Sequence, residues 1–262
     1  MNKPTVLLDH YLTTLKLPTV NREYRKIADI CQADRSDYQT FLLRLMEREI
    51  QDREIRARDR QIKAARFPVI KTLDSFDFKA QPSINQTLVR ELMSGDYIDR
   101  RENVLLIGNS GTGKTHLATA LAFGACQLGR KVRFYSATGM VTTLLERREE
   151  RQLERFNKQL ERLDLIVLDE LGYIPFTKTG AELLFEVISR AYERTSLIVT
   201  SNLPFESWTE ILGSQRLTGA LLDRLTHRIH ILEANGDSFR LKESKRRSRR
   251  QQPNTTKEVD QP

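Results

Sequence analysis

The spacing of apolar positions changes near residue 80. Before it, apolar residues recur at intervals of three and four, which is typical of amphipathic helices. The residues that set this spacing in the first helix are Leu8, Tyr11, Leu12 and Leu15. The pattern predicts a short helix that ends near Pro18, then helices at about 20–31 and 36–66.

Beyond residue 80, short apolar runs alternate with helical patterns. The expected strands are 103–107, 131–136, 165–168, 197–200 and 228–232. The expected helices are 83–94, 116–128, 138–163, 178–193, 206–212 and 215–226. Continuous apolar runs indicate strands covered on both faces, whereas the strand at 131–136 alternates basic and apolar residues and is expected near an edge. Five strands alternating with helices predict a parallel α/β sheet with right-handed crossovers.

A glycine-rich segment lies between the first expected strand and the next helix. Its residues are Gly108, Asn109, Ser110, Gly111, Thr112, Gly113, Lys114 and Thr115. Glycines let the backbone turn tightly and direct N–H groups at phosphate oxygens, and the helix adds its positive dipole end. In such a loop Lys114 is expected to bridge the β and γ phosphates, and Thr115 to hold Mg²⁺. The segment predicts an Mg-nucleotide site, and the alternative is a chance glycine-rich turn.

Polar residues follow the third and fourth expected strands. Asp169 and Glu170 end a buried strand, where ligands bind in open α/β sheets. Asp169 is expected to coordinate Mg²⁺ directly or through water, Glu170 to orient and deprotonate an attacking water, and Asn202 to hydrogen-bond the γ-phosphate and that water. The alternatives are strand-end acids at a turn and a helix cap at Asn202. Together these residues predict hydrolysis of ATP.

One arginine is a candidate to complete the site of a neighbouring subunit. Arg224 lies near the end of the last expected helix, from which it could act in trans on the γ-phosphate. Arg216 and Arg228 are competitors, and an ordinary surface arginine is the alternative. A trans-acting arginine implies a homo-oligomer.

Charge adds a candidate partner. The chain has 43 Lys and Arg against 35 Asp and Glu, a formal net charge of +8, which suggests an acidic partner such as nucleic acid. Residues 51–66 carry six basic against three acidic side chains, and 241–250 carry six against one. The first segment is either a basic arm along phosphates or a solvated helix, and the second is either a phosphate-binding or a solubilising tail. The candidate DNA contacts are Arg56, Arg58, Arg60, Lys63, Lys245, Arg246, Arg247, Arg249 and Arg250.

Cysteine content and hydropathy bear on location. The two cysteines, Cys31 and Cys126, lie far apart in expected helices, as in a reducing compartment without a disulfide framework. No run approaches the roughly 18 apolar residues of a membrane span, and the first residues lack the order of a signal peptide. We therefore expect a cytoplasmic protein without a membrane partner.

With these residues identified, the chain resembles AAA+ ATPases of the IstB-like and DnaC-like clade, and more specifically the IstB-type transposition helpers. The similar segments are 108–115, Leu168-Asp169-Glu170-Leu171-Gly172-Tyr173, Thr200-Ser201-Asn202-Leu203-Pro204-Phe205 with Trp208, Leu222-Asp223-Arg224-Leu225-Thr226-His227 and 11–18. The resemblance therefore spans nearly the whole chain. It implies a P-loop NTPase (AAA+) fold with a five-stranded parallel sheet of order 5-1-4-3-2, a small all-helical N-terminal domain and no C-terminal lid.

The resemblance also implies a function. An ATP-bound oligomer, with nucleotide between subunits, would assemble on duplex target DNA and recruit and stimulate the transposase of an insertion sequence. The alternative is a DnaC-like loader that acts on a replicative helicase and single-stranded DNA. A phosphate-loop kinase is a third possibility, but no acceptor-binding motif supports it.

The expected domain organisation combines these readings. Residues 1–66 form a helical domain for DNA or partner binding, and 67–80 form an extended linker. Residues 81–240 form the ATPase domain. Residues 241–262 form a basic tail that is expected to be disordered.

Overall fold

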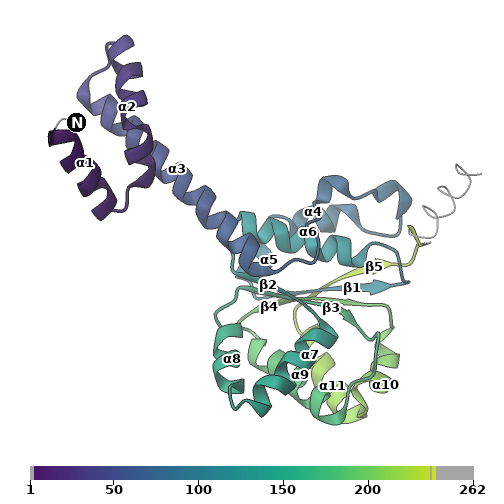
Figure 1. Ribbon diagram of the computed structural model, residues 1–262. Coiled ribbons are helices and arrows are strands. Elements are labelled where there is room, and N and C mark those ends of the chain that lie inside the picture. Colours follow the sequence, from purple (N-terminus) through teal and green to yellow (C-terminus); the bar gives the residue numbers. More distant parts are fainter. Residues whose placement is uncertain (1–2, 237, 240–262) are drawn as a thin grey trace, which may run out of the picture. The chain divides into compact units, whose positions relative to one another are not determined.

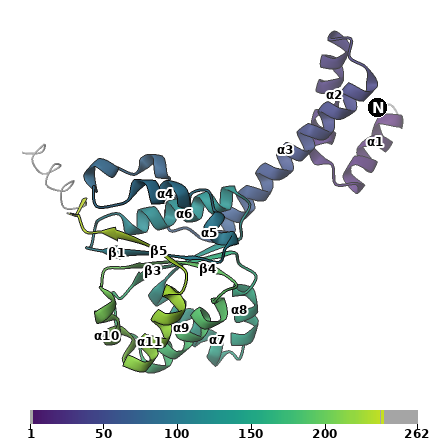
Figure 2. The ribbon, with the colours of Figure 1, turned by 180° about the vertical axis from the view of Figure 1, so that it is seen from behind.

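The computed structural model describes residues 3–236 and 238–239, and Figure 1 and Figure 2 show it from opposite sides. The chain divides into two compact units, residues 1–60 and 61–262. In the described part of the chain, no helix combines the length and the hydrophobicity needed to cross a membrane. The expected basic tail, with Lys245, Arg246, Arg247, Arg249 and Arg250, lies outside the described residues.

The first unit is helical. Its helices are α1 (Lys3–Thr14), α2 (Pro18–Ala33) and α3 (Tyr38–Ala65), the last of which continues beyond residue 60. Leu12, Val20 and Leu45, one from each helix, are buried in a small core. Pro18 begins α2, where a proline is tolerated because the N–H that it lacks would have no helical partner.

The second unit is built on a five-stranded parallel sheet. Its strands are β1 (Asn103–Gly108), β2 (Val132–Ser136), β3 (Leu165–Leu171), β4 (Ser196–Ser201) and β5 (Ile229–Ala234). The spatial order is β2-β3-β4-β1-β5, which confirms the predicted order 5-1-4-3-2 read from the other edge. The strand β2 lies at an edge, as its alternating pattern predicted.

Helices cover both faces of the sheet, so the unit has three layers (Figures 1 and 2). The helices are α4 (Gln86–Leu92), α5 (Asp96–Asp99), α6 (Lys114–Gln127), α7 (Ala137–Glu149), α8 (Leu153–Leu160), α9 (Lys178–Ala191), α10 (Trp208–Leu212) and α11 (Gln215–Thr226). Val104 and Leu106 of β1 are buried with α4, α5 and α6, whereas Leu105 between them is buried with α7 to α11. Successive residues of β1 thus face opposite layers of helices, which is why a continuous apolar run predicted a strand covered on both faces.

The prediction of one continuous helix at 138–163 was wrong. The helix expected at 138–163 is divided into α7 and α8, because Arg151 takes a left-handed conformation with φ of 57°. The helix expected at 83–94 is confirmed as α4, and α5 follows beyond the predicted range, after Gly95 at φ of 82°. A left-handed residue ends the series of helical hydrogen bonds. Because the apolar residues on both sides of it keep helical spacing, the sequence pattern does not reveal the interruption.

Residues 67–80, expected as an extended linker, lie against the sheet unit. They include two short 3₁₀ helices, η1 (Leu73–Ser75) and η2 (Phe78–Ala80). Leu73, Phe76 and Phe78 pack against the core on the α6 side of the sheet. This segment therefore belongs to the surroundings of the glycine-rich loop.

Candidate nucleotide site

The glycine-rich loop connects the end of β1 to the start of α6. Gly108 and Gly113 have φ of 143° and 95°, conformations that L side chains rarely adopt. A Cβ at Gly108 would lie 2.1 Å from the carbonyl oxygen of Ala234 in β5, and one at Gly113 would lie 2.6 Å from Cε2 of Phe76. The backbone can approach its neighbours this closely only because both side chains are absent.

The loop lines a cavity of about 520 Å³. The wall is formed by the loop, the first residues of α6, the ends of β3 and β4, the 67–80 segment and Phe239. The lining residues are Lys71, Ser75, Phe76, Asp77, Gln81, Ser110, Gly111, Thr112, Gly113, Lys114, Thr115, His116, Glu170, Tyr173, Thr200, Asn202 and Phe239. Phe239 is held there because its N–H donates a hydrogen bond of 2.9 Å to the carbonyl oxygen of Gly111. The cavity thus contains the predicted loop and two of the predicted strand-end residues, Glu170 and Asn202.

The ammonium group of Lys114 lies inside the loop. Its side chain is buried, and Nζ donates hydrogen bonds of 2.7 Å and 2.6 Å to the carbonyl oxygens of Gly108 and Asn109. The hydroxyl of Thr112 donates to the same Asn109 oxygen at 2.8 Å. A cation is therefore held among backbone groups at the helix N-terminus, which is the arrangement that attracts phosphate.

A hydrogen-bonded network joins the loop to two strands. The hydroxyls of Thr115 and Thr200 both donate to Oδ1 of Asp169, at 3.0 Å and 2.7 Å. The N–H of Glu170 donates to Oγ1 of Thr200 at 2.9 Å. Sequence reasoning missed Thr200, although a hydroxyl residue at the end of the strand beside Asp169 is a usable signal. The network fixes the buried Asp169 carboxylate next to the Thr115 hydroxyl.

These oxygens fit a magnesium ion. Mg²⁺ prefers oxygen ligands at about 2.0–2.1 Å in octahedral geometry, so two adjacent ligands lie about 2.9 Å apart. The Thr115 and Asp169 oxygens are 3.0 Å apart. Both residues predicted to hold the metal are thus close enough to share one ion.

Glu170 and Asn202 reach the cavity from the ends of neighbouring strands. The pairing of β3 with β4 shifts register between Leu168 and Leu171, and Glu170 has φ of 60° at this irregularity. Bulges of this kind redirect side chains and often lie beside active sites. Both side chains are exposed and line the cavity, so a carboxylate and an amide are available to a bound phosphate or water.

His116 is a lining residue that sequence reasoning missed. Its Nε2 lies 3.0 Å from the carbonyl oxygen of Thr72 and 3.2 Å from Oγ of Ser75, and its ring meets Phe76 edge-on. Burial lowers the pKa of His116. The hydrogen bond with the Thr72 carbonyl oxygen acts to raise this pKa, and the positive charge of Lys71 acts to lower it, so the net shift is downward. The neutral imidazole therefore ties α6 to the 67–80 segment. Its place directly after Thr115 is the available sequence signal.

Arg224 lies at the other end of the sheet from the loop. Its Nη1 donates to the carbonyl oxygen of Ala220 at 2.8 Å, and its guanidinium lies 4.8 Å from the ring centroid of Phe185. Asn103, the first residue of β1, donates from its side chain to the carbonyl oxygen of Leu225 at 3.0 Å. The end of α11 therefore lies beside the start of β1, whereas the loop follows its end. Arg224 is not among the described residues that line the cavity.

The competitors of Arg224 lie at different ends of α11. Arg216 is exposed in the first turn, and Arg228 is exposed just after the helix. The carbonyl oxygen of Arg228 accepts a hydrogen bond of 2.8 Å from the N–H of Asn103, so Arg228 also lies at the start of β1. Neither residue is among the described residues that line the cavity.

The four candidate DNA contacts within the described residues do not lie in one place. Arg56 forms an ion pair of 3.3 Å with the buried Glu49 and lines, with Arg60, a second cavity in the helical unit. Arg58 instead faces Glu54, at 3.7 Å. Lys63 is exposed and lies beyond the helical unit as bounded by residue contacts. The structure thus brings Arg56 and Arg60 together and leaves Arg58 apart from them.

Sequence comparisons identify relatives over nearly the whole chain. The family model described as IstB-like ATP binding protein matches residues 10–247. An insertion sequence IS21 ATP-binding protein of Pseudomonas aeruginosa is 38% identical over 239 residues, which cover 91% of this chain and 90% of that protein. An insertion sequence IS5376 ATP-binding protein of Geobacillus stearothermophilus is 36% identical over 244 residues, covering 93% and 97%.

Solved structures share the fold. DnaA from Aquifex aeolicus, bound to AMPPCP, superposes with a TM-score of 0.54 at 21% identity, over 72% of this chain and 57% of that one. DnaI superposes with a TM-score of 0.50 at 14% identity, over 64% of this chain and 89% of that one. These likenesses and the sheet order show an AAA+ P-loop fold. The chain belongs to the family of IstB-like ATP binding proteins.

Proposed function

We propose that this protein is an Mg²⁺-dependent ATPase whose ATP-bound oligomer assembles on duplex target DNA and there recruits and stimulates the transposase of an insertion sequence. Hydrolysis of ATP then releases the assembly. The observation that carries the proposal is the network of Thr115, Asp169, Thr200 and Glu170, which joins the helix after the phosphate loop to a candidate metal ligand and a candidate base. Nucleotide binding alone does not require such a base.

The loop and the residues at the ends of β3 and β4 each have a role in this reaction. The loop N–H groups and Lys114 hold the phosphates, while Thr115 and Asp169 would hold Mg²⁺, which supplies positive charge against the phosphate oxygens. Glu170 accepts a proton from the attacking water, and Asn202 donates hydrogen bonds that orient this water and the γ-phosphate. Both side chains line the cavity.

A neighbouring subunit supplies the remaining positive charge. Arg224 lies beside the start of β1 and is not among the described residues that line its own cavity, and this position supports a role in the site of a second subunit. In GTPases an arginine supplied in trans accelerates hydrolysis by about 10³–10⁵-fold. Nucleotide between subunits would make ATP a requirement for assembly, which couples the chemistry to the oligomer.

The relatives support the proposed partners. Both relatives described above are named as ATP-binding proteins of insertion sequences, which are mobile DNA segments served by a transposase. The net charge of +8 favours association with nucleic acid. We therefore assign duplex DNA, the cognate transposase and further copies of this chain as partners.

The test is the Glu170→Gln variant of the full-length protein. It should bind ATP normally, hydrolyse it at least about 100-fold more slowly because the base is lost, and remain on duplex DNA as oligomers. Glu206→Gln, which removes an exposed carboxylate that is not among the cavity-lining residues, is the matched control and should behave as the unmodified protein.

Two results would change the proposal. Normal hydrolysis by Glu170→Gln would show that Glu170 is not the base. A clear preference for single-stranded over duplex DNA in the presence of ATP would favour a helicase loader over a transposition helper.

A further inference from the structure

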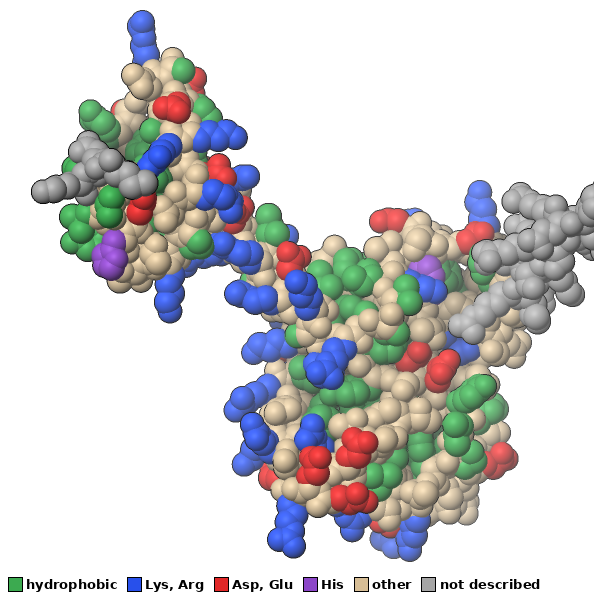
Figure 3. Space-filling model, viewed as in Figure 1, with side chains coloured by type: hydrophobic (Ala, Val, Ile, Leu, Met, Phe, Trp, Pro, Cys, Tyr) green, Lys and Arg blue, Asp and Glu red, His purple; other side chains and the backbone are tan. Residues whose placement is uncertain are grey.

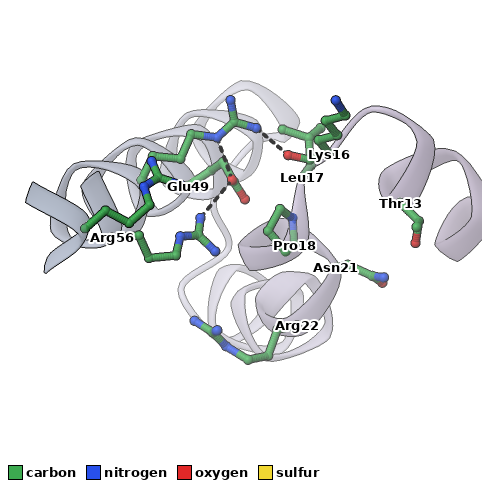
Figure 4. Close-up of a pocket in the computed structure, with 10 residues that line it drawn as sticks. Thr13, Lys16, Leu17, Pro18, Asn21, Arg22, Glu49 and Arg56 are labelled. Carbon is green, nitrogen blue, oxygen red and sulfur yellow. Dashed lines mark hydrogen bonds and ion pairs between the residues drawn. The ribbon is translucent and has the colours of Figure 1, made fainter. Parts of the chain in front are cut away.

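The helical unit contains a second cavity, of about 720 Å³, that the nucleotide site does not use. Five basic side chains and one acidic side chain line it, beside apolar and uncharged polar residues. The charged lining residues are Lys16, Arg22, Glu49, Arg53, Arg56 and Arg60. Figure 3 shows basic side chains gathered on this unit, and Figure 4 shows the cavity itself.

Glu49 fixes the arginines of this cavity. Its side chain is 3% exposed, and Oε2 accepts hydrogen bonds of 2.8 Å and 3.1 Å from the N–H groups of Thr19 and Val20. Its other oxygen, Oε1, accepts from Nε of Arg53 at 2.7 Å and pairs with Nη2 of Arg56 at 3.3 Å. The carboxylate thus satisfies the first N–H groups of α2 and holds two guanidinium groups at the cavity wall (Figure 4).

Burial and pairing act oppositely on the pKa of Glu49. Burial alone would raise this pKa, but the hydrogen bonds from Arg53, Val20 and Thr19 outweigh burial and lower it. Glu49 is therefore ionised at neutral pH and neutralises one positive charge. Because five basic side chains line the cavity, an excess of positive charge remains.

Two of the cavity's cations have no ion-pair partner among the described residues. Lys16 and Arg60 form no ion pair there, and both are exposed. Arg22 is paired with Asp52 at 2.7 Å and with Glu23 at 2.8 Å. Lys16 and Arg60 are therefore the groups whose charge is most available to an anion.

The three arginines of α3 lie along one line. Arg53, Arg56 and Arg60 are spaced by three and four residues, so they share one face of the helix. The line is about 10 Å long at 1.5 Å per residue. Phosphates on one strand of duplex DNA follow each other every 3.4 Å or so along its axis. The row of three arginines is therefore about as long as three consecutive phosphates on one strand of duplex DNA.

We propose that this cavity binds consecutive phosphates of one strand of duplex DNA, which makes the helical unit a DNA contact in its own right. The proposal rests on the function proposed above and names the residues that meet the DNA backbone. It replaces Arg58, which is not among the residues that line the cavity, with the lining residues Lys16, Arg22 and Arg53. Guanidinium groups suit phosphate because their N–H groups form forked hydrogen bonds with its oxygens.

The test compares two double variants of the full-length protein in the presence of ATP. Lys16→Ala with Arg60→Ala removes the two unpaired cations of the cavity. Lys26→Ala with Arg58→Ala removes the same charge from exposed positions of the same unit that are not among the cavity-lining residues. Binding to a duplex is measured over a series of salt concentrations, with thermal unfolding and ATPase rate measured alongside.

The cavity variant should lose the contribution of two phosphate contacts. The slope of log affinity against log salt should fall in magnitude by about two, and the affinity at low salt should fall at least about tenfold. The control variant should change the slope by less than one, and both variants should unfold and hydrolyse ATP as the unmodified protein does.

The outcomes separate this proposal from the function on which it rests. Equal DNA binding by the two variants would overturn the assignment of the cavity and leave the proposed function intact. A second result would also overturn this assignment: both double variants bind DNA equally well, but the cavity variant alone no longer binds the transposase. The cavity would then be assigned to an acidic protein segment. No duplex binding by the unmodified protein would overturn the proposed function and this inference together.

Discussion

The hydroxyl of Thr115 donates a hydrogen bond of 3.0 Å to Oδ1 of Asp169, so the helix after the phosphate loop is joined to the end of β3. The strands that carry these residues to the site are not neighbours, because β4 lies between β1 and β3. Thr200 at the end of β4 donates to the same carboxylate oxygen at 2.7 Å. Hydroxyl groups from the start of α6 and the end of β4 thus meet at one carboxylate oxygen of β3.

This relationship predicts how the site depends on magnesium. Asp169→Asn keeps the shape of the side chain and removes its charge, so the affinity for ATP in Mg²⁺ should fall to the value measured in a chelator. Hydrolysis should fall at least about 100-fold, because the phosphate charge is no longer neutralised. Nucleotide titrations with Mg²⁺ and with a chelator measure the effect. An unchanged dependence on Mg²⁺ would show that Asp169 does not hold the metal.

The loop and the five strands could be predicted from the sequence for local reasons, whereas the strand order 5-1-4-3-2 was implied only by the family resemblance. The glycines, Lys114 and Thr115 are specified by a short contiguous pattern, and the five apolar runs each match one strand. The Thr200 hydrogen bond and the contact of Phe76 with Gly113 depend on residues brought together by the fold. No spacing within the chain encodes such contacts, so the sequence did not predict them.

The break at Arg151 and the Glu49 anchor were missed for different reasons. Arg151 has none of the usual signals of a left-handed residue, because that conformation favours glycine and asparagine. Glu49 lies within a charged stretch and appears as a solvated side chain, although it is 3% exposed. Its burial follows from the approach of α2 to α3, which only the structure reveals.

Mixing variants tests the proposed role of Arg224. Arg224→Ala should bind ATP normally and hydrolyse it about 10³-fold more slowly, and Lys114→Ala should fail to bind ATP. If Arg224 acts in trans, a mixture should recover activity, because a Lys114→Ala subunit supplies the arginine to an intact loop on its Arg224→Ala neighbour. ATPase assays of each variant and of the mixture measure this.

The competing arginines provide the control for this experiment. Arg228→Ala and Arg216→Ala should hydrolyse ATP at near-normal rates when assayed alone. A different result would assign the trans role to Arg216. In that case Arg224→Ala would keep full ATPase activity, and a mixture of Lys114→Ala with Arg216→Ala would recover ATPase activity.

Gly108 tests the close approach of the loop to β5. A Cβ there would lie 2.1 Å from the carbonyl oxygen of Ala234, and φ is 143°. Gly108→Ala should therefore destabilise the sheet unit by about 3 kcal/mol or more. The new Cβ would force the backbone of β5 or of the loop to move, and alanine would also be strained at this positive φ. Thermal unfolding of the full chain measures the loss. Gly129→Ala is the control, since its φ is also positive, at 85°, but there is open space at its Cβ, and it should cost only about 1 kcal/mol.

Glu49 predicts a pH dependence of the helical unit. The pKa of Glu49 is lowered in the folded state, so its stabilising contribution is present above about pH 4.3 and is lost as the pH falls through the folded pKa. Glu49→Gln should lower the stability of this unit by about 2 kcal/mol at neutral pH and flatten its pH dependence in acid. Amide hydrogen exchange in α2 and α3 of the full chain measures both. Unchanged exchange would show that the carboxylate does not anchor α2.

The proposed function requires that ATP controls the binding of this protein to duplex DNA. The most direct measurement is the affinity of the full-length protein for duplex DNA with Mg-ATP, with Mg-ADP and without nucleotide, at one fixed salt concentration. We expect Mg-ATP to tighten binding at least about tenfold, within the usual range of coupling between two sites, and Lys114→Ala to abolish this difference. Equal affinity in all three conditions would contradict the proposed function.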